Sequence, residues 1–552
     1  MERTIAKFDT APDTILHNAK IFTVDRELAW ASAVAIKGSE ILAVGEEKDV
    51  LDLKSNRTRL IDLERSIVLP GLCDAHIHFY DWSLSLDQVN LANCQSKDEL
   101  LFRVAQGSRS RPGGRWIVGR GWNESGWKAP NMPKKDELDK ATQPDQPTLL
   151  WRNDMHCAVV NSAALELAGI TGFSEDPESG RIGRDASGAP NGILWELAIN
   201  LVSDLIPPPS YEEFEAQAVK GMGKLNRLGI TAVHDQRMKD QSEGPLAMNV
   251  YQRLQEKDKI NLRINCNIAA HDLQHIRSLG MRSGFGSDTV RIGHLKLFAD
   301  GTMGSQTAWM LKPFSGQKII ETNEFGINLT PPEQMIEEIR TARQHGIPTS
   351  IHAIGDMANK VVLDIFEEIV QSGPELAIPN RIEHVQIIDP ADLPRLAALG
   401  LTASVQPIHV LDDMDTANRL LGKRAVNSYR FRSLAESGAL LALGSDAPVA
   451  DPNPFLGIHA AVTRQLPDRM SEEPWYGRER LTLEQSIFGY TMGPALASGW
   501  HQTIGSISRG KKADMIVLDR NPFELVADGI AGDELADVDV RMSIFDGKIT
   551  EH

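Results

Sequence analysis

The sequence predicts an α/β protein built around an eight-stranded (β/α)8 barrel of the TIM type. In the middle of the chain, short apolar segments alternate with amphipathic helical segments, the pattern of βα units in a parallel sheet. Both chain ends show a different pattern, with short strands of alternating polar and apolar residues separated by turns. We therefore expect a barrel with a large insertion after its first strand, plus a small β-sandwich domain built from both chain ends.

The small domain is expected to combine residues 1–70 with residues 499–552. Its strands are expected in TILHNAKIFTV, SAVAIKGSEILAVG, IGSISRGKKADMIVLD and VRMSIFDGKI. Neither terminal piece is long enough to close a sheet over a core of its own, so a shared domain satisfies both. The barrel is then expected to occupy residues 71–498.

Eight barrel strands can be counted along the central part of the chain. They are IVLPGLCDAH, GITAVHD, LRINCNIA, HLKLFAD, IPTSIHAIG, RIEHVQ, LTASVQP and ALLALGSD. Eight parallel strands, each followed by a helix, close a TIM-type barrel. Apolar residues recur at helical spacing in residues 357–372, which predicts one of the helices between strands.

Residues 80–225 are expected to form an insertion between the first two strands. This segment is far longer than the connection that a crossover helix needs. It contains most of the tryptophans of the chain and leaves the end of the first strand. It could therefore cover the barrel mouth and line a substrate pocket, and a packing appendage is the alternative.

Composition and charge limit the partners that we expect. The formal net charge of −17 would repel the phosphates of nucleic acids and an anionic membrane surface, so neither is expected as a partner. There is no run of about 18 apolar residues and no signal-peptide core, which predicts a cytoplasmic protein. The four cysteines lie far apart, and we expect reduced, mostly buried thiols. A small-molecule substrate is expected, and a homo-oligomer is left open.

Ionisable side chains stand at or near the carboxyl ends of several predicted strands, where barrel enzymes build their active sites. They are His76, His78, Lys296, His352, His384 and Asp446. One residue separates His76 from His78 in an extended segment, so both project from the same face. An unpaired ionisable group is costly to bury in such apolar stretches, and a divalent metal would compensate several at once. We therefore expect a metal site.

Histidine and carboxylate ligands without a cysteine are typical of catalytic zinc or a similar first-row ion. Such an ion lowers the pKa of bound water to about 7 and polarises a carbonyl, so the expected reaction is hydrolysis. Asp446 is the expected acid and base, which takes a proton from the water and passes it to a leaving nitrogen. His156, His234 and Asp300 are weaker candidates for substrate contacts, each with a structural role as the alternative. The remaining histidines, His409 included, are expected to be surface or packing residues.

Several motifs together resemble the amidohydrolase superfamily, and within it amidohydrolase family 3, the YtcJ-like proteins that include N-substituted formamide deformylases. The motifs are PGLCDAHIH, DMHCAVVNSAALELAGI, KLFADGTMGS, IHAIGD, RIEH, LGSDAPV and GSISRGKKADMIVLD. They cover nearly the whole chain in the expected order. The resemblance implies metal-dependent hydrolysis of a carbon–nitrogen bond, in an amide, N-formyl or cyclic amide group of a small molecule.

The resemblance also implies roles for the candidate ligands. His76 and His78 would bind one metal, and His352 and His384 a second. Asp446 would bind the first metal and the water. Because some members of the superfamily keep a single metal, one or two Zn²⁺ ions are both open.

Lys296 matches the position where many members of the superfamily carry a lysine carboxylated by carbon dioxide, which bridges two metals. In the alternative, Lys296 is an unmodified ion-pair partner of a carboxylate such as Asp300, with one metal in the site. Two other functions stay open: a metal-dependent esterase, lactonase or carbamate hydrolase on the same site, and a non-catalytic regulatory barrel.

Overall fold

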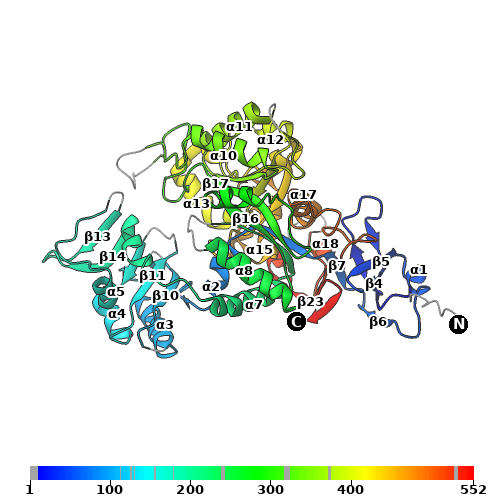
Figure 1. Cartoon of the computed structure of the whole chain (residues 1–552), viewed down its shortest axis with the longest axis horizontal. Helices are drawn as coiled ribbons and strands as arrows, with labels where there is room; N and C mark the ends of the chain where they lie inside the picture. The colour runs from blue at the N-terminus through cyan, green and yellow to red at the C-terminus, as the bar shows by residue number, and fades with distance from the viewer. Residues whose placement is uncertain are drawn as a thin grey trace. The chain divides into compact units, whose positions relative to one another are not determined.

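The chain forms two compact units in the structure, which is a computed structural model. One unit combines Met1–Trp82 with Ala218–His552, and the other is Ser83–Gln217. The first unit holds the barrel and the sheets of both chain ends, and the second holds most of the predicted insertion (Figure 1). The structure describes residues 10–111, 113–124, 127–129, 131–153, 157–177, 180–237, 243–315, 324–370, 374–526 and 533–552.

An eight-stranded parallel sheet forms the centre of the first unit. Its strands follow the chain order: β8 (Leu72–Ile77), β15 (Ile230–Asp235), β16 (Arg263–Ala269), β17 (Val290–Phe298), β18 (Thr349–Ala353), β19 (Arg381–His384), β20 (Thr402–Val405) and β21 (Leu440–Leu443). The first and last strands meet beyond their carboxyl ends. There the Asp446 N–H donates to the His76 carbonyl at 2.7 Å, and the His78 N–H donates to the Ala447 carbonyl at 2.9 Å. The predicted fold class is confirmed, and each of the eight predicted segments overlaps one of these strands.

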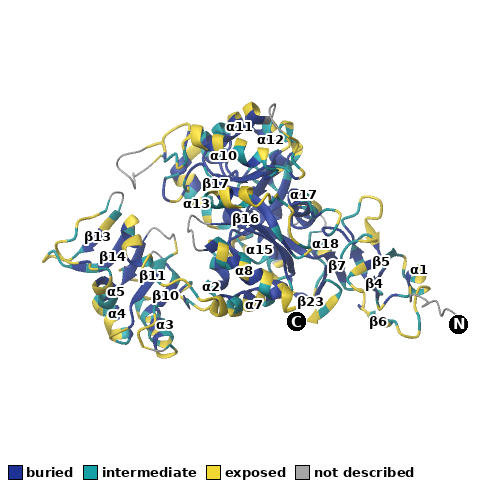
Figure 2. Ribbon diagram, in the orientation of Figure 1, coloured by how far each residue is buried: buried dark blue, intermediate teal, exposed yellow. Residues whose placement is uncertain are grey.

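Helices follow the barrel strands and lie outside the sheet, and several of them have exposed outer faces (Figure 2). They are α8 (Glu243–Glu256), α9 (Leu273–Ser278), α10 (Pro332–Gln344), α11 (Asp356–Val370), α12 (Leu393–Ala398), α13 (His409–Leu421), α14 (Phe431–Glu436), α15 (Pro454–Thr463), α16 (Leu483–Gly489) and α17 (Met492–Ala497). Helix α11 is the helix predicted in residues 357–372, and its Val362 and Phe366 are fully buried. These side chains belong to the large core cluster between sheet and helices.

The predicted first strand, IVLPGLCDAH, is in fact two strands. β7 (Ile67–Pro70) pairs within the small domain, and β8 starts at Leu72 within the barrel. Gly71 stands between them, and a Cβ atom there would lie 2.2 Å from Oγ1 of Thr231 on β15. A glycine is therefore required where the chain passes from one sheet into the other.

The first unit has two further sheets, a six-stranded one with strands from both chain ends and a four-stranded one with strands from residues 14–62. The six-stranded sheet has the order β24 (Lys548–Glu551), β23 (Val540–Phe545), β22 (Met515–Leu518), β7, β2 (Lys20–Phe22) and β3 (Trp30–Ala31). The four-stranded sheet has the order β5 (Glu40–Gly45), β4 (Ala33–Lys37), β1 (Thr14–His17) and β6 (Arg59–Asp62). Val68 pairs with Ile21 on one side and Val517 on the other, and Val34 and Ile36 of the second sheet share its core cluster. The expected β-sandwich from both ends is thus present.

The second unit is built on a six-stranded sheet of its own. The order is β13 (Gly180–Arg184), β14 (Pro190–Glu196), β12 (Cys157–Val160), β11 (Thr148–Arg152), β10 (Ile117–Trp122) and β9 (Val89–Asn90). Its helices are α3 (Lys97–Arg109), α4 (Lys135–Ala141), α5 (Ser162–Leu167) and α6 (Asn200–Ser203). Trp122 and Trp127 are buried in the core of this unit. These two tryptophans therefore serve packing, and a role of the insertion at the barrel mouth stays a prediction.

The boundaries of the two units fall within helices α2 (Phe79–Ser85) and α7 (Tyr211–Arg227). Two short helices belong to the terminal pieces, α1 (Glu47–Leu51) and α18 (Pro522–Leu525). Among the described residues, every helix is too short or too polar to cross a membrane. All four cysteines are buried and free, as expected.

Candidate metal centre

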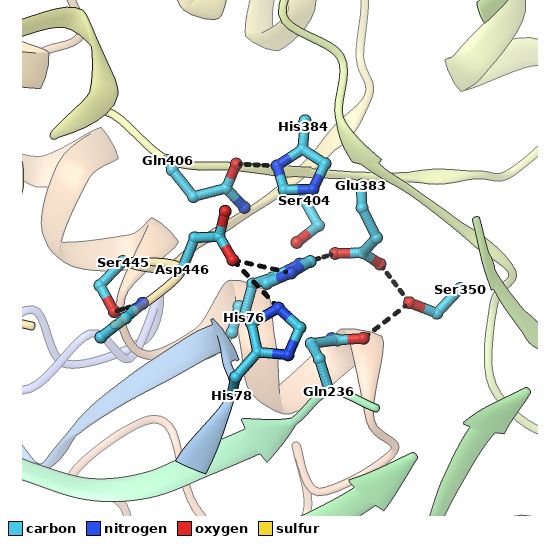
Figure 3. A network of polar contacts seen from close by, with 12 residues as sticks. His76, His78, Gln236, Ser350, Glu383, His384, Ser404, Gln406, Ser445 and Asp446 are labelled. Carbon is cyan, nitrogen blue, oxygen red and sulfur yellow. Dashed lines mark hydrogen bonds and ion pairs between the residues drawn. The ribbon is translucent and has the colours of Figure 1, made fainter. Parts of the chain in front are cut away.

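Three of the predicted metal ligands bring their donor atoms together beyond the carboxyl ends of the barrel strands. They come from three different strands or strand ends: His76 from β8, His384 from β19, and Asp446 from the segment after β21. One ligand atom from each lies within 4.8 Å of the other two, and all three residues are buried. Figure 3 shows the three side chains converging. This is a donor set of two imidazoles and one carboxylate, which suits zinc.

His76 and His78 both reach the same carboxylate oxygen, as their spacing predicts. Oδ1 of Asp446 lies 3.4 Å from Nε2 of His76 and 3.2 Å from Nε2 of His78 (Figure 3). Burial favours the protonated form of Asp446, but the contact with His78 and the neighbouring imidazoles of His76 and His384 hold its pKa well below the usual range. The carboxylate is therefore ionised, the form that binds a cation.

Unpaired polar atoms in this cluster test whether a metal fits. Nε2 of His76 and Oδ1 of Asp446 are buried and have no well-aligned hydrogen bond within the described part of the chain. Burying a polar atom without a partner is unfavourable, and a divalent cation between these atoms would satisfy both. The donor types and the unpaired atoms fit a divalent metal.

Glu383 sets the orientation and tautomer of His76. Nδ1 of His76 donates to Oε2 of Glu383 at 2.6 Å, so Nε2 presents its lone pair to the centre. Glu383 accepts further hydrogen bonds from Arg381 at 2.5 Å and Ser350 at 2.6 Å. Burial raises the pKa of Glu383, but Arg381 and His76 hold it well below the usual range. A carboxylate behind the imidazole is typical of metal-ligating histidines.

The backbone is left-handed at two of the three clustered residues. The φ angles are +76° at His384 and +63° at Asp446. In a regular strand, the neighbours Glu383 and His384 would point to opposite faces. Here both face His76, because Glu383 bonds its ring and the ring of His384 lies 4.7 Å away between centroids. Unusual backbone conformations of this kind occur at functional sites.

His352 and Lys296 lie beside this cluster, but their nitrogen atoms are not among the mutually close ligand atoms. The ring of His352 is 4.6 Å from that of His384, and its Nε2 lies 3.1 Å from the carbonyl oxygen of Gly301. Nζ of Lys296 lies 5.0 Å from the centroid of the Phe298 ring. In the part of the chain that the structure describes, the mutually close donors come from His76, His384 and Asp446. The other predicted ligands surround them.

The protonation states favour metal binding. Burial, and next to it the charge of Lys296, lowers the pKa of His76 to about 4 and that of His352 to about 3. Burial also lowers the pKa of Lys296 to about 8, against the opposing charges of Glu383 and Asp446. Neutral imidazoles are the form that binds metal ions. Because its pKa is lowered, the Lys296 amine loses its proton at a pH closer to the physiological value than an ordinary lysine does.

Asp300 joins the loop that follows β17 to the segment that follows β18. Its carboxylate accepts hydrogen bonds from the backbone N–H groups of Ile354 at 2.9 Å, Gly355 at 2.7 Å and Trp309 at 2.8 Å. Burial raises the pKa of Asp300 to about 7 in spite of these bonds. An ion pair between Asp300 and Lys296 is absent from the contacts of the described residues. The alternative role considered for Lys296, as a partner of Asp300, is therefore not observed.

His234 and His156 differ from the other candidates. His234 is fully buried in the barrel interior, where its Nδ1 accepts a hydrogen bond from Nη1 of Arg381 at 2.6 Å. Burial and the Arg381 charge hold the pKa of His234 well below its usual value. It stays a weak candidate for a substrate contact, beside its observed contact with Arg381. His156 lies outside the described residues.

The sequence-based prediction missed four residues of the site. Glu383 and Arg381 support His76, Gln406 accepts a 2.8 Å hydrogen bond from Nδ1 of His384, and His409 lies 3.8 Å from Asp446. The segments RIEH and SVQPIH contain all four. Polar residues at strand ends are the signal that could have found Gln406, whereas His409 begins the following helix.

The chain matches known proteins over most of its length. A family model described as "Amidohydrolase family" matches residues 59–550. The chain is 29% identical to YtcJ of Bacillus subtilis, covering 97% of this chain and 98% of that protein. It is 28% identical to the N-substituted formamide deformylase of Arthrobacter pascens, covering 97% of each chain.

A solved structure gives the same result. The crystal structure of an uncharacterized metal-dependent hydrolase from Pyrococcus horikoshii superposes with a TM-score of 0.76 at 27% identity, covering 92% of this chain and 98% of that chain. The resemblance predicted from the motifs is confirmed. Because the family match runs from β6 through all eight barrel strands to β24, the chain belongs to the amidohydrolase family.

Proposed function

We propose that this protein hydrolyses a carbon–nitrogen bond in an amide, N-formyl or cyclic amide group of a small molecule, by means of a bound divalent metal. The observation that carries the proposal is the buried cluster of His76, His384 and Asp446, with ligand atoms within 4.8 Å of one another. The family supports hydrolysis of amide-type bonds in general. Similarity to a formamide deformylase supports the carbon–nitrogen bond.

His76, His384 and Asp446 would hold the first metal, and His78 lies close enough to Oδ1 of Asp446 to join them. This proposal differs from the family resemblance, which implies His384 as a ligand of a second metal. A divalent ion, with Zn²⁺ suited to these donors, would lower the pKa of a water molecule and polarise the substrate carbonyl. His352 would contribute to a second ion if two are bound.

Lys296 would join the ligands after carboxylation. Its neutral amine forms an N–C bond with carbon dioxide and releases a proton, which gives an anionic carbamate with two oxygen donors. The lowered pKa of about 8 supports this step, because it raises the fraction of neutral amine near neutral pH.

Asp446 would move the proton during hydrolysis. Its Oδ1 faces His76 and His78, so Oδ2 is the oxygen available to the reactants. The carboxylate would accept a proton from the attacking water as the new C–O bond forms. It would return that proton to the leaving nitrogen as the C–N bond breaks, so the products are a carboxylic acid and an amine.

A substrate panel tests this function. Zinc- or manganese-loaded protein would be incubated with N-formyl amines, N-acyl amines, cyclic amides and simple esters, and the released acid and amine would be quantified. Asp446→Asn, prepared in the same way, controls for a contaminating hydrolase. We expect turnover of at least one nitrogen-containing class by the native protein, with a loss in the variant. Turnover of esters alone would instead indicate an esterase.

A further inference from the structure

In two stacked histidines at the barrel mouth, the Nδ1 atoms have opposite roles in hydrogen bonds: one donates and the other accepts. The rings of His384 and His409 lie 6.4 Å apart and 14° from parallel. Nδ1 of His384 donates to Oε1 of Gln406 at 2.8 Å, whereas Nε2 of Gln386 donates to Nδ1 of His409 at 3.2 Å. A neutral imidazole carries one N–H. His384 therefore presents a lone pair at Nε2, and His409 presents an N–H at Nε2.

The Nε2 atom of His409 faces the side of Asp446 that the other histidines leave open. It lies 3.8 Å from Oδ2 of Asp446, whereas His76 and His78 approach Oδ1. That distance is too long for a hydrogen bond, so the N–H can reach a third group beside Oδ2.

The same N–H is buried and unused. His409 is 6% exposed, and its Nε2 makes no hydrogen bond within the described part of the chain. The cluster of mutually close ligand atoms does not include His409. An Nε2 atom that carries a proton is also unable to bind a metal. The position thus suits a hydrogen-bond donor and not a ligand.

We infer that His409 is a catalytic residue that donates a hydrogen bond to the oxygen of the scissile carbonyl of the substrate. The inference rests on the proposed function, since an amide-type carbonyl must lie next to Asp446. When water attacks, that oxygen gains negative charge. A preorganised N–H stabilises the charged oxygen more strongly than it stabilises the uncharged carbonyl oxygen of the bound substrate. The proton of His409 stays on its nitrogen throughout. Gln386 is a positioning residue, because its hydrogen bond selects this tautomer.

Kinetics on the best N-formyl amine of the panel test this role. His409→Leu removes the donor, and kcat is expected to fall about 100-fold or more, as for other single oxyanion donors. KM is expected to change less than about threefold, because the hydrogen bond from His409 becomes strong only in the transition state and adds little to substrate binding. His409→Gln retains an N–H and is expected to recover part of the lost rate. His345→Leu is the matched control, since His345 lies between α10 and β18, at the opposite end of the barrel, and its kcat should be unchanged.

Zinc content separates this role from metal binding. Elemental analysis is expected to find the same zinc in His409→Leu as in the native protein. Loss of zinc in this variant, or a kcat within threefold of native for both His409 variants, would overturn the inference.

Two measurements do not depend on turnover. Methylphosphonate, a tetrahedral oxyanion, is expected to bind zinc-loaded His409→Leu at least tenfold more weakly than native protein, by calorimetry. The ¹⁵N shifts of the His409 ring are expected to report the Nε2-protonated tautomer. Equal phosphonate affinity, or protonation at Nδ1, would overturn the inference. If the native protein hydrolyses nothing in the panel, the proposed function fails, and these two measurements still decide the role of His409 as a donor.

Discussion

Nδ1 of His76 donates a 2.6 Å hydrogen bond to Oε2 of Glu383, and both side chains are fully buried. The bond joins β8 to β19 and turns the lone pair of Nε2 toward Asp446. The orientation of His76, one of the proposed metal ligands, thus depends on a residue outside the cluster of close donors.

Glu383→Gln is expected to weaken zinc affinity about 10- to 100-fold, the usual effect of losing the partner of a metal-ligating histidine. The variant also leaves Arg381 with a weaker partner, so thermal unfolding should be recorded alongside. Ser350→Ala removes a hydrogen bond to Glu383 without changing its charge and is the matched control. Competition titration with a chelator measures the affinity. Unchanged affinity in a folded Glu383→Gln would refute the orienting role.

His76→Ala and His78→Ala are expected to lose bound zinc and turnover, with the larger loss in His76→Ala. His76 belongs to the cluster of three close donors, whereas His78 contacts Oδ1 of Asp446 at 3.2 Å but is outside that cluster. Elemental analysis after dialysis gives the zinc content, with His345→Leu as the control for loss of a histidine elsewhere. Full zinc occupancy with a near-native rate in both alanine variants would contradict the metal role of the pair.

Asp446→Asn keeps the shape of the side chain but loses its basicity, so kcat should fall about 100-fold or more. Substrate binding should survive, because the amide fills the same space. Steady-state kinetics at saturating zinc separates kcat from KM. A variant that retains a tenth of the native rate would show that another group moves the proton.

Lys296 provides a pH-dependent prediction. Its pKa is lowered to about 8, so the neutral amine increases as the pH rises through this value, and carboxylation needs that form. Activation of the zinc-loaded protein by bicarbonate is therefore expected to be greater above pH 8 than about two units below it.

A second test concerns the carbamate itself. A short-chain carboxylic acid should partly restore the rate of Lys296→Ala, because it supplies the missing oxygen donors. An unmodified amine in a zinc-loaded crystal with two fully occupied metals would end the bridging hypothesis.

Gly71→Ala is expected to lower the free energy of unfolding by about 1–3 kcal/mol, a typical cost of overpacking. The new methyl group would lie 2.2 Å from Oγ1 of Thr231. Gly45→Ala is the control, since a Cβ atom there would have no neighbour within 4 Å among the described residues. Denaturant unfolding compares the two. Equal stabilities would show that the passage between sheets tolerates a side chain.

The barrel could be predicted from sequence because its strands are short apolar runs, each separated by a helical pattern. The break at Gly71 could not, since IVLPGLCDAH is apolar on both sides of the glycine and only the pairing partners distinguish β7 from β8. The candidate ligands could also be predicted, because a histidine, lysine or aspartate at the end of an apolar run is visible in the local sequence.

Other features of the site depend on contacts between distant residues. The bond between His76 and Glu383 joins positions 307 residues apart, and no local pattern predicts it. Residue type alone does not predict the left-handed backbone at His384 and Asp446, because histidine and aspartate adopt positive φ more often than most residues but still rarely. From the sequence His409 is expected to be a surface or packing residue, and only the fold brings it to 3.8 Å from Asp446.

The most direct test of the central claim is an anomalous difference map of crystals of the zinc-loaded protein, recorded at the zinc edge. We predict a zinc peak about 2.0–2.2 Å from Nε2 of His76 and from a carboxylate oxygen of Asp446, with His384 as a further ligand at a similar distance. Crystals with zinc bound elsewhere and none between these three side chains would contradict the metal centre.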